Sequence, residues 1–196
     1  MHCMTDPTRT LSQAIGVRVK QGRTARRWTL DRLAEAAGVS RRMVVTVEKG
    51  EANPSVATLV RISSALGIGL PALVEAPAAS DTRITRRGEG AALWRGPRGG
   101  EGRLLVGTRA PESLELWEWI LQADEEHGSD AHAPGTRELL QVRTGTLSIR
   151  TGHQVHELGA GDAIAYAGDV SHAYANTGSV RTVFVLTVFT PQTTEN

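Results

Sequence analysis

The spacing of apolar side chains changes near residue 76. Before that point apolar residues recur every three or four positions, as in Leu59, Ile62 and Leu66, which is the period of a helix with one buried face. Ser40 and Ser55 stand where helix N-caps are expected. These signals predict helices over residues 10–26, 30–37, 41–49, 55–66 and 70–74.

From about residue 82 the chain consists of short β-type runs separated by glycine and proline. Turn signals such as Thr144-Gly145 and Gly152-His153 separate the runs, and no helix-length amphipathic segment lies between them. Short strands at regular spacing favour an antiparallel sandwich or barrel over a parallel α/β fold. The predicted strands are Leu104–Gly107, Leu114–Leu121, Glu138–Arg143, Thr146–Thr151, Gln154–Leu158, Ala163–Tyr166, His172–Ala175 and Val180–Phe189.

The two patterns predict a two-domain protein. An all-α domain of five helices occupies residues 10–75, and an all-β domain occupies residues 88–192. The segment EAPAASDT at residues 75–82 is small, polar and proline-containing, so residues 76–87 are expected to be a linker.

Charge is distributed unevenly between the two predicted domains. Residues 1–75 carry 11 Lys or Arg against 6 Asp or Glu, whereas residues 76–196 carry 11 against 15. A basic first third is expected of a domain that meets a polyanion. The single cysteine, Cys3, permits no intrachain disulfide, and no apolar run has the length of a membrane span or a signal peptide, so a cytoplasmic location is expected.

Residues 29–67 contain a pattern that brings two helices together at a sharp angle. Ala34 and Ala37 are small enough for a close approach, Gly38 permits the turn, and a second helix begins after Ser40. This geometry projects the first turn of the second helix outward, where it can enter a DNA major groove.

The segments LAEAAGVS, Glu48-Lys49-Gly50, Asn53-Pro54-Ser55 and LVRISSALG resemble the phage-repressor or XRE type of helix-turn-helix. The resemblance covers roughly residues 12–74. It implies that Thr29 and Ser40 lie at helix N-termini suited to phosphate oxygens. It also implies an ion pair between Arg23 and Glu48, and that the residues facing the bases are Arg41, Arg42, Met43 and Thr46.

Arginine suits guanine, because O6 and N7 accept the two donors of a guanidinium fork. Arg41 or Arg42 is therefore expected to read a G·C pair, and Met43 to contact a thymine methyl group. The alternative role for either arginine is a contact with phosphate, which positions the protein without reading sequence.

Residues 127–176 resemble a cupin, a small β-barrel whose two motifs supply inward-facing ligands. In the first motif, HAPGTRELLQVRTG places His132, Glu138 and Gly145 in register, and Pro134 replaces a histidine. In the second, GDAIAYAGDVSHAYAN places Gly161, His172 and Asn176 in register, while Ala167 and Asp169 replace the family's proline and glycine.

The resemblance implies a metal site reduced to His132, Glu138 and His172. Two imidazoles and a carboxylate can hold a divalent transition metal such as Fe(II), Mn(II), Ni(II) or Zn(II) and leave open positions. Asp130-x-His132 offers another frame, with both side chains on one strand face. Alternatively, these residues bind a small effector or one another without metal.

The aromatic residues add a second reason to expect a ligand pocket. Trp117 and Trp119 share a strand face, as do His172 and Tyr174. An effector pocket is therefore predicted from Trp117, Trp119, His132, Glu138, His172 and Tyr174, with filling of the core as the alternative role of the aromatic rings. His153 and His156 are expected to be solvated.

These expectations combine into a DNA-binding transcriptional regulator, a homodimeric repressor whose cupin domain binds a small-molecule effector. Double-stranded DNA, the effector and a second copy are the expected partners. One alternative is a metal-dependent cupin enzyme with an accessory DNA-binding domain, although the missing fourth ligand argues against it. An antitoxin is a further alternative, because helix-turn-helix domains of this type also occur there.

Overall fold

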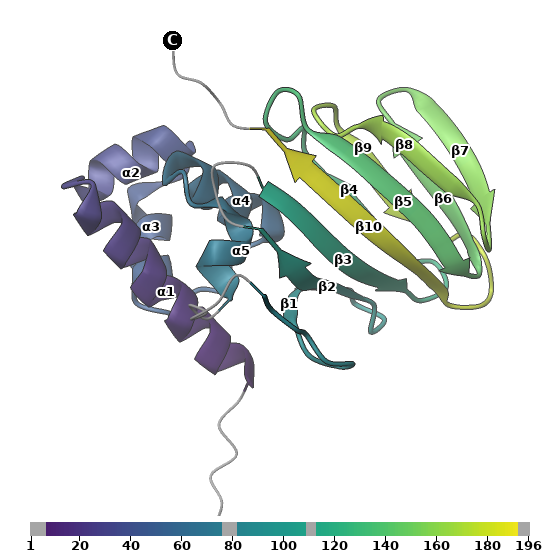
Figure 1. Cartoon of the computed structure of the whole chain (residues 1–196), viewed down its shortest axis with the longest axis horizontal. Helices are drawn as coiled ribbons and strands as arrows, with labels where there is room; N and C mark the ends of the chain where they lie inside the picture. The colour runs from purple at the N-terminus through teal and green to yellow at the C-terminus, as the bar shows by residue number, and fades with distance from the viewer. Residues whose placement is uncertain (1–6, 76–81, 109–112, 192–196) are drawn as a thin grey trace, which may run out of the picture. The chain divides into compact units, whose positions relative to one another are not determined.

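The structure is a computed structural model that describes residues 7–75, 82–108 and 113–191. The chain divides into two compact units, one containing all the described helices and the other all the described strands (Figure 1). Among the described residues, no helix is both long enough and apolar enough to cross a membrane.

The first unit contains the five helices that the sequence predicts, with boundaries that differ by at most three residues. Side chains of Thr29, Ser40 and Ser55 accept backbone N–H groups in the first turns of α2, α3 and α4, which confirms them as N-caps. The helices are α1 (Pro7–Ala25), α2 (Leu30–Ala37), α3 (Arg41–Glu48), α4 (Val56–Ala65) and α5 (Gly69–Val74).

Two glycines allow the sharp turn and the close helix contact of the helical unit. Gly38 ends α2 in the left-handed conformation, at φ 60°, and so allows the sharp turn into α3. Gly16 lets α1 approach the backbone of α3 closely, because a Cβ atom there would lie 2.5 Å from the carbonyl oxygen of Val47. The core between the helices includes Val19, Leu33 and Val44, each with no exposed surface.

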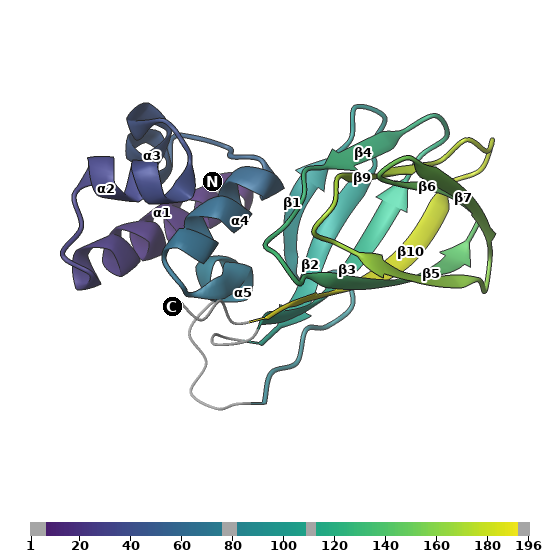
Figure 2. The ribbon, with the colours of Figure 1, turned by 90° about the horizontal axis from the view of Figure 1, so that it is seen from above.

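The second unit consists of two antiparallel sheets that face each other (Figure 2). The six-stranded sheet has the order β1-β2-β3-β10-β5-β8, and the four-stranded sheet has the order β4-β9-β6-β7. The strands are β1 (Ala91–Arg95), β2 (Glu101–Gly107), β3 (Ser113–Leu121), β4 (Glu126–Ser129), β5 (Arg137–Thr144), β6 (Thr146–Thr151), β7 (Gln154–Gly159), β8 (Ala163–Ala167), β9 (His172–Ala175) and β10 (Thr182–Thr190).

All eight predicted strands are present, and two further strands, β1 and β4, were not predicted from the sequence. β1 and β4 lack a clean alternation of apolar and polar residues, so the pattern gave no strand signal there. The last strand begins at Thr182 rather than at Val180, whose side chain is 62% exposed. Residues 76–81 of the predicted linker and Cys3 lie outside the described residues, and closure of the two sheets into a barrel stays a prediction.

Strand register places polar groups level with one another on the inner face of the six-stranded sheet. Glu115 on β3 pairs with Val188 on β10, which pairs with Glu138 on β5, which pairs with Tyr166 on β8. The neighbouring inward-facing row contains the buried residues Trp117, Leu186 and Leu140. The space between the sheets is therefore apolar in the middle and carries a polar row near one end.

Candidate functional site

The exposed side chains of α3 are concentrated in its first turn. Arg41 and Arg42 are exposed, and Met43 and Thr46 are half-buried, whereas Val44 and Val47 are buried against the other helices. A short helix with this division presents one face to a partner while the other anchors it in the core. The predicted base-facing residues therefore share the accessible face of α3.

The contacts that these residues make within the helical unit are weak or local. The Arg41 guanidinium lies 3.1 Å from a carboxylate oxygen of Asp31, but both side chains are mostly exposed. Exposed ion pairs contribute little to stability. The hydroxyl of Thr46 donates to backbone carbonyls within α3, so its present role is local.

The ion pair implied for Arg23 and Glu48 is confirmed. Two nitrogens of Arg23 donate to the two carboxylate oxygens of Glu48 at 2.6 and 2.9 Å, and a third donates to the carbonyl of Trp28. Hydrogen bonding to Glu48 raises the pKa of Arg23 above its already high value. This nearly buried pair ties α1 to the end of α3.

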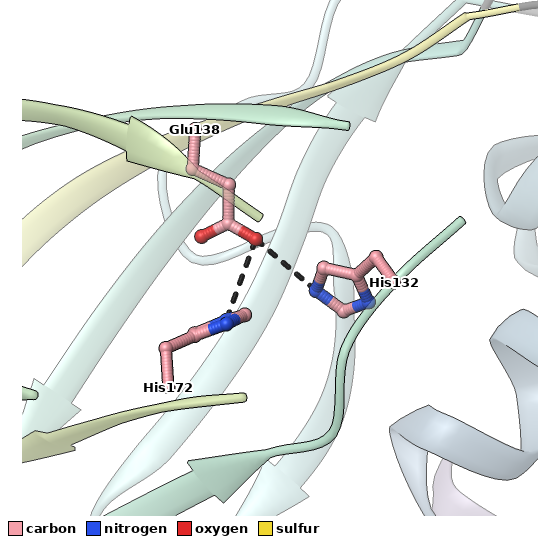
Figure 3. Close-up of side chains that lie close together, drawn as sticks. All are labelled: His132, Glu138 and His172. Carbon is pink, nitrogen blue, oxygen red and sulfur yellow. Dashed lines mark ion pairs between the residues drawn. The ribbon is translucent and has the colours of Figure 1, made fainter. Parts of the chain in front are cut away.

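In the second unit, His132, Glu138 and His172 converge on one point (Figure 3). One carboxylate oxygen of Glu138, Oε1, lies 3.1 Å from Nε2 of His132 and 3.4 Å from Nε2 of His172. Glu138 is completely buried and His172 almost completely, while His132 is about one-fifth exposed. The sequence-predicted ligands are thus brought together, whereas Asp130 is exposed and outside the cluster.

Two loops hold the three side chains in place. The backbone N–H of His132 donates to the carbonyl of Gly168, and the N–H of Gly168 donates to the carbonyl of Thr136. Gly168 also leaves room beside the cluster, since a Cβ atom there would lie 3.0 Å from Oε1 of Glu138. These contacts join the segment before β5 to the segment before β9.

The hydrogen bonding of the cluster fits a cation. Nδ1 of His172 lies 2.8 Å from the carbonyl oxygen of Val170, so Nδ1 carries the proton, and in the neutral ring Nε2 directs a lone pair toward Glu138. Oε1 of Glu138 is buried without a hydrogen-bond donor. Ligands about 2.1 Å from a common metal are separated by roughly 3.0–3.4 Å, which matches the distances from Oε1 of Glu138 to the two histidines.

The second oxygen of Glu138 has different partners. Oε2 accepts hydrogen bonds from the phenols of Tyr166 and Tyr174, the latter at 2.7 Å. Burial raises the pKa of Glu138, but the neighbouring imidazoles of His132 and His172 and the hydrogen bond from Tyr166 outweigh it and lower the pKa. Burial and the charge of Glu138 raise the pKa of both tyrosines. The phenols therefore remain donors and leave only Oε1 to face the histidines.

The two tryptophans of the predicted pocket lie in the core of the β unit. Trp117 and Trp119 are each 3% exposed, and their rings stack with centroids 5.9 Å apart. Nε1 of Trp117 donates to Glu115, and Trp119 stacks on Phe184. Among the six predicted pocket residues, Tyr174 is the one that joins this aromatic cluster to Glu138.

Two further ionisable residues, half-buried His127 and buried Glu115, lie near the cluster and were not predicted from the sequence. His127 on β4 packs against Trp119 and Trp94, and burial together with the charge of His172 lowers its pKa to about 4. Burial raises the pKa of Glu115 despite hydrogen bonds from Trp117 and Ser113. Neither residue belongs to a motif, and His127 lies on a strand without a sequence signal. By contrast, His153 is exposed and His156 is half-buried.

Comparison with known proteins agrees with this geometry. A helix-turn-helix family model matches residues 19–73, and a cupin-domain model matches residues 117–189. The chain joins an XRE-type helix-turn-helix domain to a C-terminal cupin domain.

This helix-turn-helix–cupin protein is similar to regulators over almost its whole length. It is 27% identical to the HTH-type transcriptional regulator SutR of Escherichia coli over 86% of this chain and 90% of that protein. The crystal structure of an HTH_3 family transcriptional regulator from Vibrio cholerae is 27% identical, covers 94% of this chain and 99% of its own, and has a TM-score of 0.72. The immunity repressor protein of Bacillus phage phi105 is 40% identical over 60 residues, or 31% of this chain and 42% of that protein.

Proposed function

We propose that this protein is a sequence-specific DNA-binding transcriptional regulator that acts as a homodimeric repressor controlled by its cupin domain. The observation that carries the proposal is the accessible first turn of α3, where Arg41 and Arg42 are exposed on a helix anchored by Val44 and Val47. An isolated domain makes few base contacts, so a two-fold dimer on an inverted repeat is the economical route to specificity. Similarity to named regulators supports the same function.

Phosphate contacts are assigned to the N-termini of α2 and α3. The side chains of Thr29 and Ser40 each cap one N–H group, and the remaining free N–H groups of the first turns suit phosphate oxygens. The excess of basic residues in the first 75 positions also attracts the negatively charged DNA backbone.

Selection of binding sites from random duplex DNA by the full chain tests this function. The expected product is one enriched inverted repeat with half-sites centred about 10 base pairs apart or a multiple of that distance. Recovery of no enriched sequence, with binding that depends only on salt, would contradict sequence-specific regulation.

For the cupin domain we propose that His132, Glu138 and His172 bind a divalent transition metal, which serves as part of the effector site. The two short distances to the donor-free oxygen of Glu138 support this assignment. A bound metal would supply a Lewis-acidic centre with open positions for an effector, and Tyr166 and Tyr174 would keep Glu138 as a one-oxygen ligand.

Calorimetric titration of chelator-treated protein with Mn(II), Fe(II), Ni(II) and Zn(II) tests the metal site. One ion per chain is expected, with His172→Ala abolishing binding and His153→Ala, at an exposed histidine, leaving it unchanged. Absence of binding by all four ions, or equal binding by both variants, would refute the metal and leave a metal-free pocket.

A further inference from the structure

A cavity of about 940 Å³ lies between β7 and β8. These two strands follow each other along the chain but are edge strands of different sheets, so they do not pair with each other (Figure 1). We call this space the β7–β8 cavity. Its volume falls within the range of roughly 300–1,000 Å³ that is typical of small-molecule sites.

Strand register shows which side chains of β7 and β8 face the cavity. On β7, His156 and Leu158 pair with buried aliphatic residues of β6, so their side chains point between the sheets. On β8, Ile164 and Tyr166 pair with buried residues of β5 and point the same way. All four line the cavity and are half-buried, so their surfaces are available to a ligand.

The chain itself closes the β7–β8 cavity at both ends. The turn at residues 159–162 joins the two strands and is fixed by two hydrogen bonds between Gly159 and Asp162. At the other end, the N–H of Gly152 donates to the carbonyl of Ser171. An extended peptide would have to continue past these ends, so the enclosure favours a small molecule.

Tyr166 separates the β7–β8 cavity from the candidate metal site. Its hydroxyl is already engaged with Glu138 and with the hydroxyl of Tyr174, and its ring meets that of His172 edge-on, with centroids 5.6 Å apart. The described residues that line the cavity include none of the three cluster residues. A molecule in the cavity therefore contacts the ring of Tyr166 rather than the cluster.

Charge around the cavity restricts what it can bind. Among the described residues that line it, none is lysine or arginine, so a carboxylate or phosphate would be buried without a counter-charge. Glu157 lies between His156 and Leu158 on β7, so alternation points it to the outer face, where it is exposed and offers no buried partner to an ammonium group. An imidazole can donate or accept a hydrogen bond, so His156 suits an uncharged polar group.

We propose that the β7–β8 cavity is a second small-molecule site of the cupin domain, separate from the His132–Glu138–His172 cluster, for an uncharged molecule with an apolar body and one hydrogen-bonding group. His156 binds the hydrogen-bonding group, and Leu158 and Ile164 contact the apolar body. Val155 and Val170 also line the cavity and are 59% and 40% exposed, which gives it an apolar entrance. This site goes beyond the proposed function, because it requires neither DNA binding nor a metal.

Fluorescence titration of the full chain with two related probes tests the ligand class. N-phenylnaphthylamine is neutral, whereas anilinonaphthalenesulfonate adds a negative charge to the same ring system. The neutral probe is expected to bind at one molecule per chain with a micromolar Kd. The sulfonate should displace it with a Kd at least about tenfold higher, because the cavity offers the sulfonate group no counter-charge.

Two substitutions that narrow the cavity test its location. His156→Trp places an indole in the cavity and should raise the Kd of the neutral probe at least about tenfold. His153→Trp, the matched substitution at an exposed histidine outside the lining, should leave the Kd unchanged. Ile164→Phe narrows the cavity from β8 and should weaken binding as well, which keeps the test decisive if His156→Trp does not fold. Circular dichroism checks the fold of each variant.

Absence of saturable binding of the neutral probe, or unchanged binding in the folded cavity variants, would overturn the site. Equal or tighter binding of the sulfonate would overturn the ligand class. Chelator-treated protein and protein supplied with Zn(II) should bind the neutral probe with the same Kd, and a difference would contradict the separation from the cluster. Failure of the metal or DNA-binding proposals would leave all of these probe measurements unchanged.

Discussion

A nearly buried ion pair joins two helices of the first unit. In the helical unit the two-pronged contact of Arg23 with Glu48 joins α1 to α3. Removing one partner of a buried ion pair leaves the other charge buried without a partner, which lowers the free energy of unfolding substantially. Breaking an exposed ion pair changes that free energy little.

Glu48→Gln should therefore destabilise the helical unit by about 3 kcal/mol, the usual cost of an uncompensated buried charge. Glu35→Gln breaks the exposed pair with Arg32 and should cost below about 1 kcal/mol. Urea unfolding followed by circular dichroism measures both. Equal effects of the two substitutions would show that the buried pair has no special structural role.

His127 gives the β unit a predicted sensitivity to acid. Its pKa falls from 6.5 to about 4 on folding, so the unfolded chain binds a proton that the folded chain does not. Stability is then lost as the pH falls from about 6.5 to about 4, by up to roughly 3 kcal/mol. His127→Phe keeps a ring among Trp94 and Trp119 and should remove this part of the pH dependence.

Unfolding of the β unit at several pH values, followed by tryptophan fluorescence in a Trp28→Phe background, measures this difference. Trp28 is replaced because it lies in the helical unit, whereas the other three tryptophans lie in the β unit. Identical pH profiles with and without the His127→Phe substitution would contradict the assigned role of the histidine.

Tyr166 and Tyr174 are proposed to position Glu138 rather than to bind metal. Tyr166→Phe removes one donor from Oε2, and partners of this type typically alter metal affinity about 10–100-fold. Calorimetry should therefore show weaker binding with one ion still bound per chain. Unchanged affinity would show that the remaining phenol of Tyr174 suffices.

At the scale of elements, the sequence predicted most of the fold because its signals are local. Caps at Thr29, Ser40 and Ser55 and the turn at Gly38 act within a few residues, so the helices could be located closely. β4 depends on a partner far along the chain, β9, whereas β1 pairs with β2 across the short turn at residues 96–100. The residues of neither strand alternate between apolar and polar, so only pairing with a partner makes them strands, as it can in short segments.

Part of the candidate site was predictable for the same reason. His132, Glu138 and His172 stand at motif spacings and converge as expected. The hydrogen bonds of Tyr166 and Tyr174 to Glu138 and the packing of His127 on Trp119 depend on pairing between strands distant in sequence. No sequence pattern specifies such contacts.

Two glycines at contacts between helices are expected to respond differently to replacement by alanine. At Gly38 no atom lies within 4 Å of a new Cβ. Gly38→Ala should therefore lower the free energy of unfolding only by the cost of holding alanine in the left-handed conformation, about 1 kcal/mol. At Gly16 the new Cβ would meet the backbone of α3 at 2.5 Å, so Gly16→Ala should force α1 and α3 apart and cost several times more. Thermal unfolding of both variants measures the difference, and a larger cost at Gly38 would contradict the close packing of α1 on α3.

At the scale of the whole molecule, the two units divide the proposed function between them. The helical unit carries Arg41 and Arg42, the proposed readers of DNA, and the β unit carries the His132–Glu138–His172 cluster, the proposed effector site. Substitutions in the cluster are expected to change control by the effector without changing the preferred DNA sequence.

The most direct test of the central claim is the affinity of the wild type, Arg41→Ala and Arg42→Ala for the selected site and for every single base-pair substitution of it. The wild type should lose about 1–3 kcal/mol of binding free energy on substitution of a G·C pair in each half-site. One arginine variant should lose that discrimination while keeping the preferences at other positions. If both variants rank all the substituted sites as the wild type does, α3 does not read the bases through these arginines, and the account is wrong.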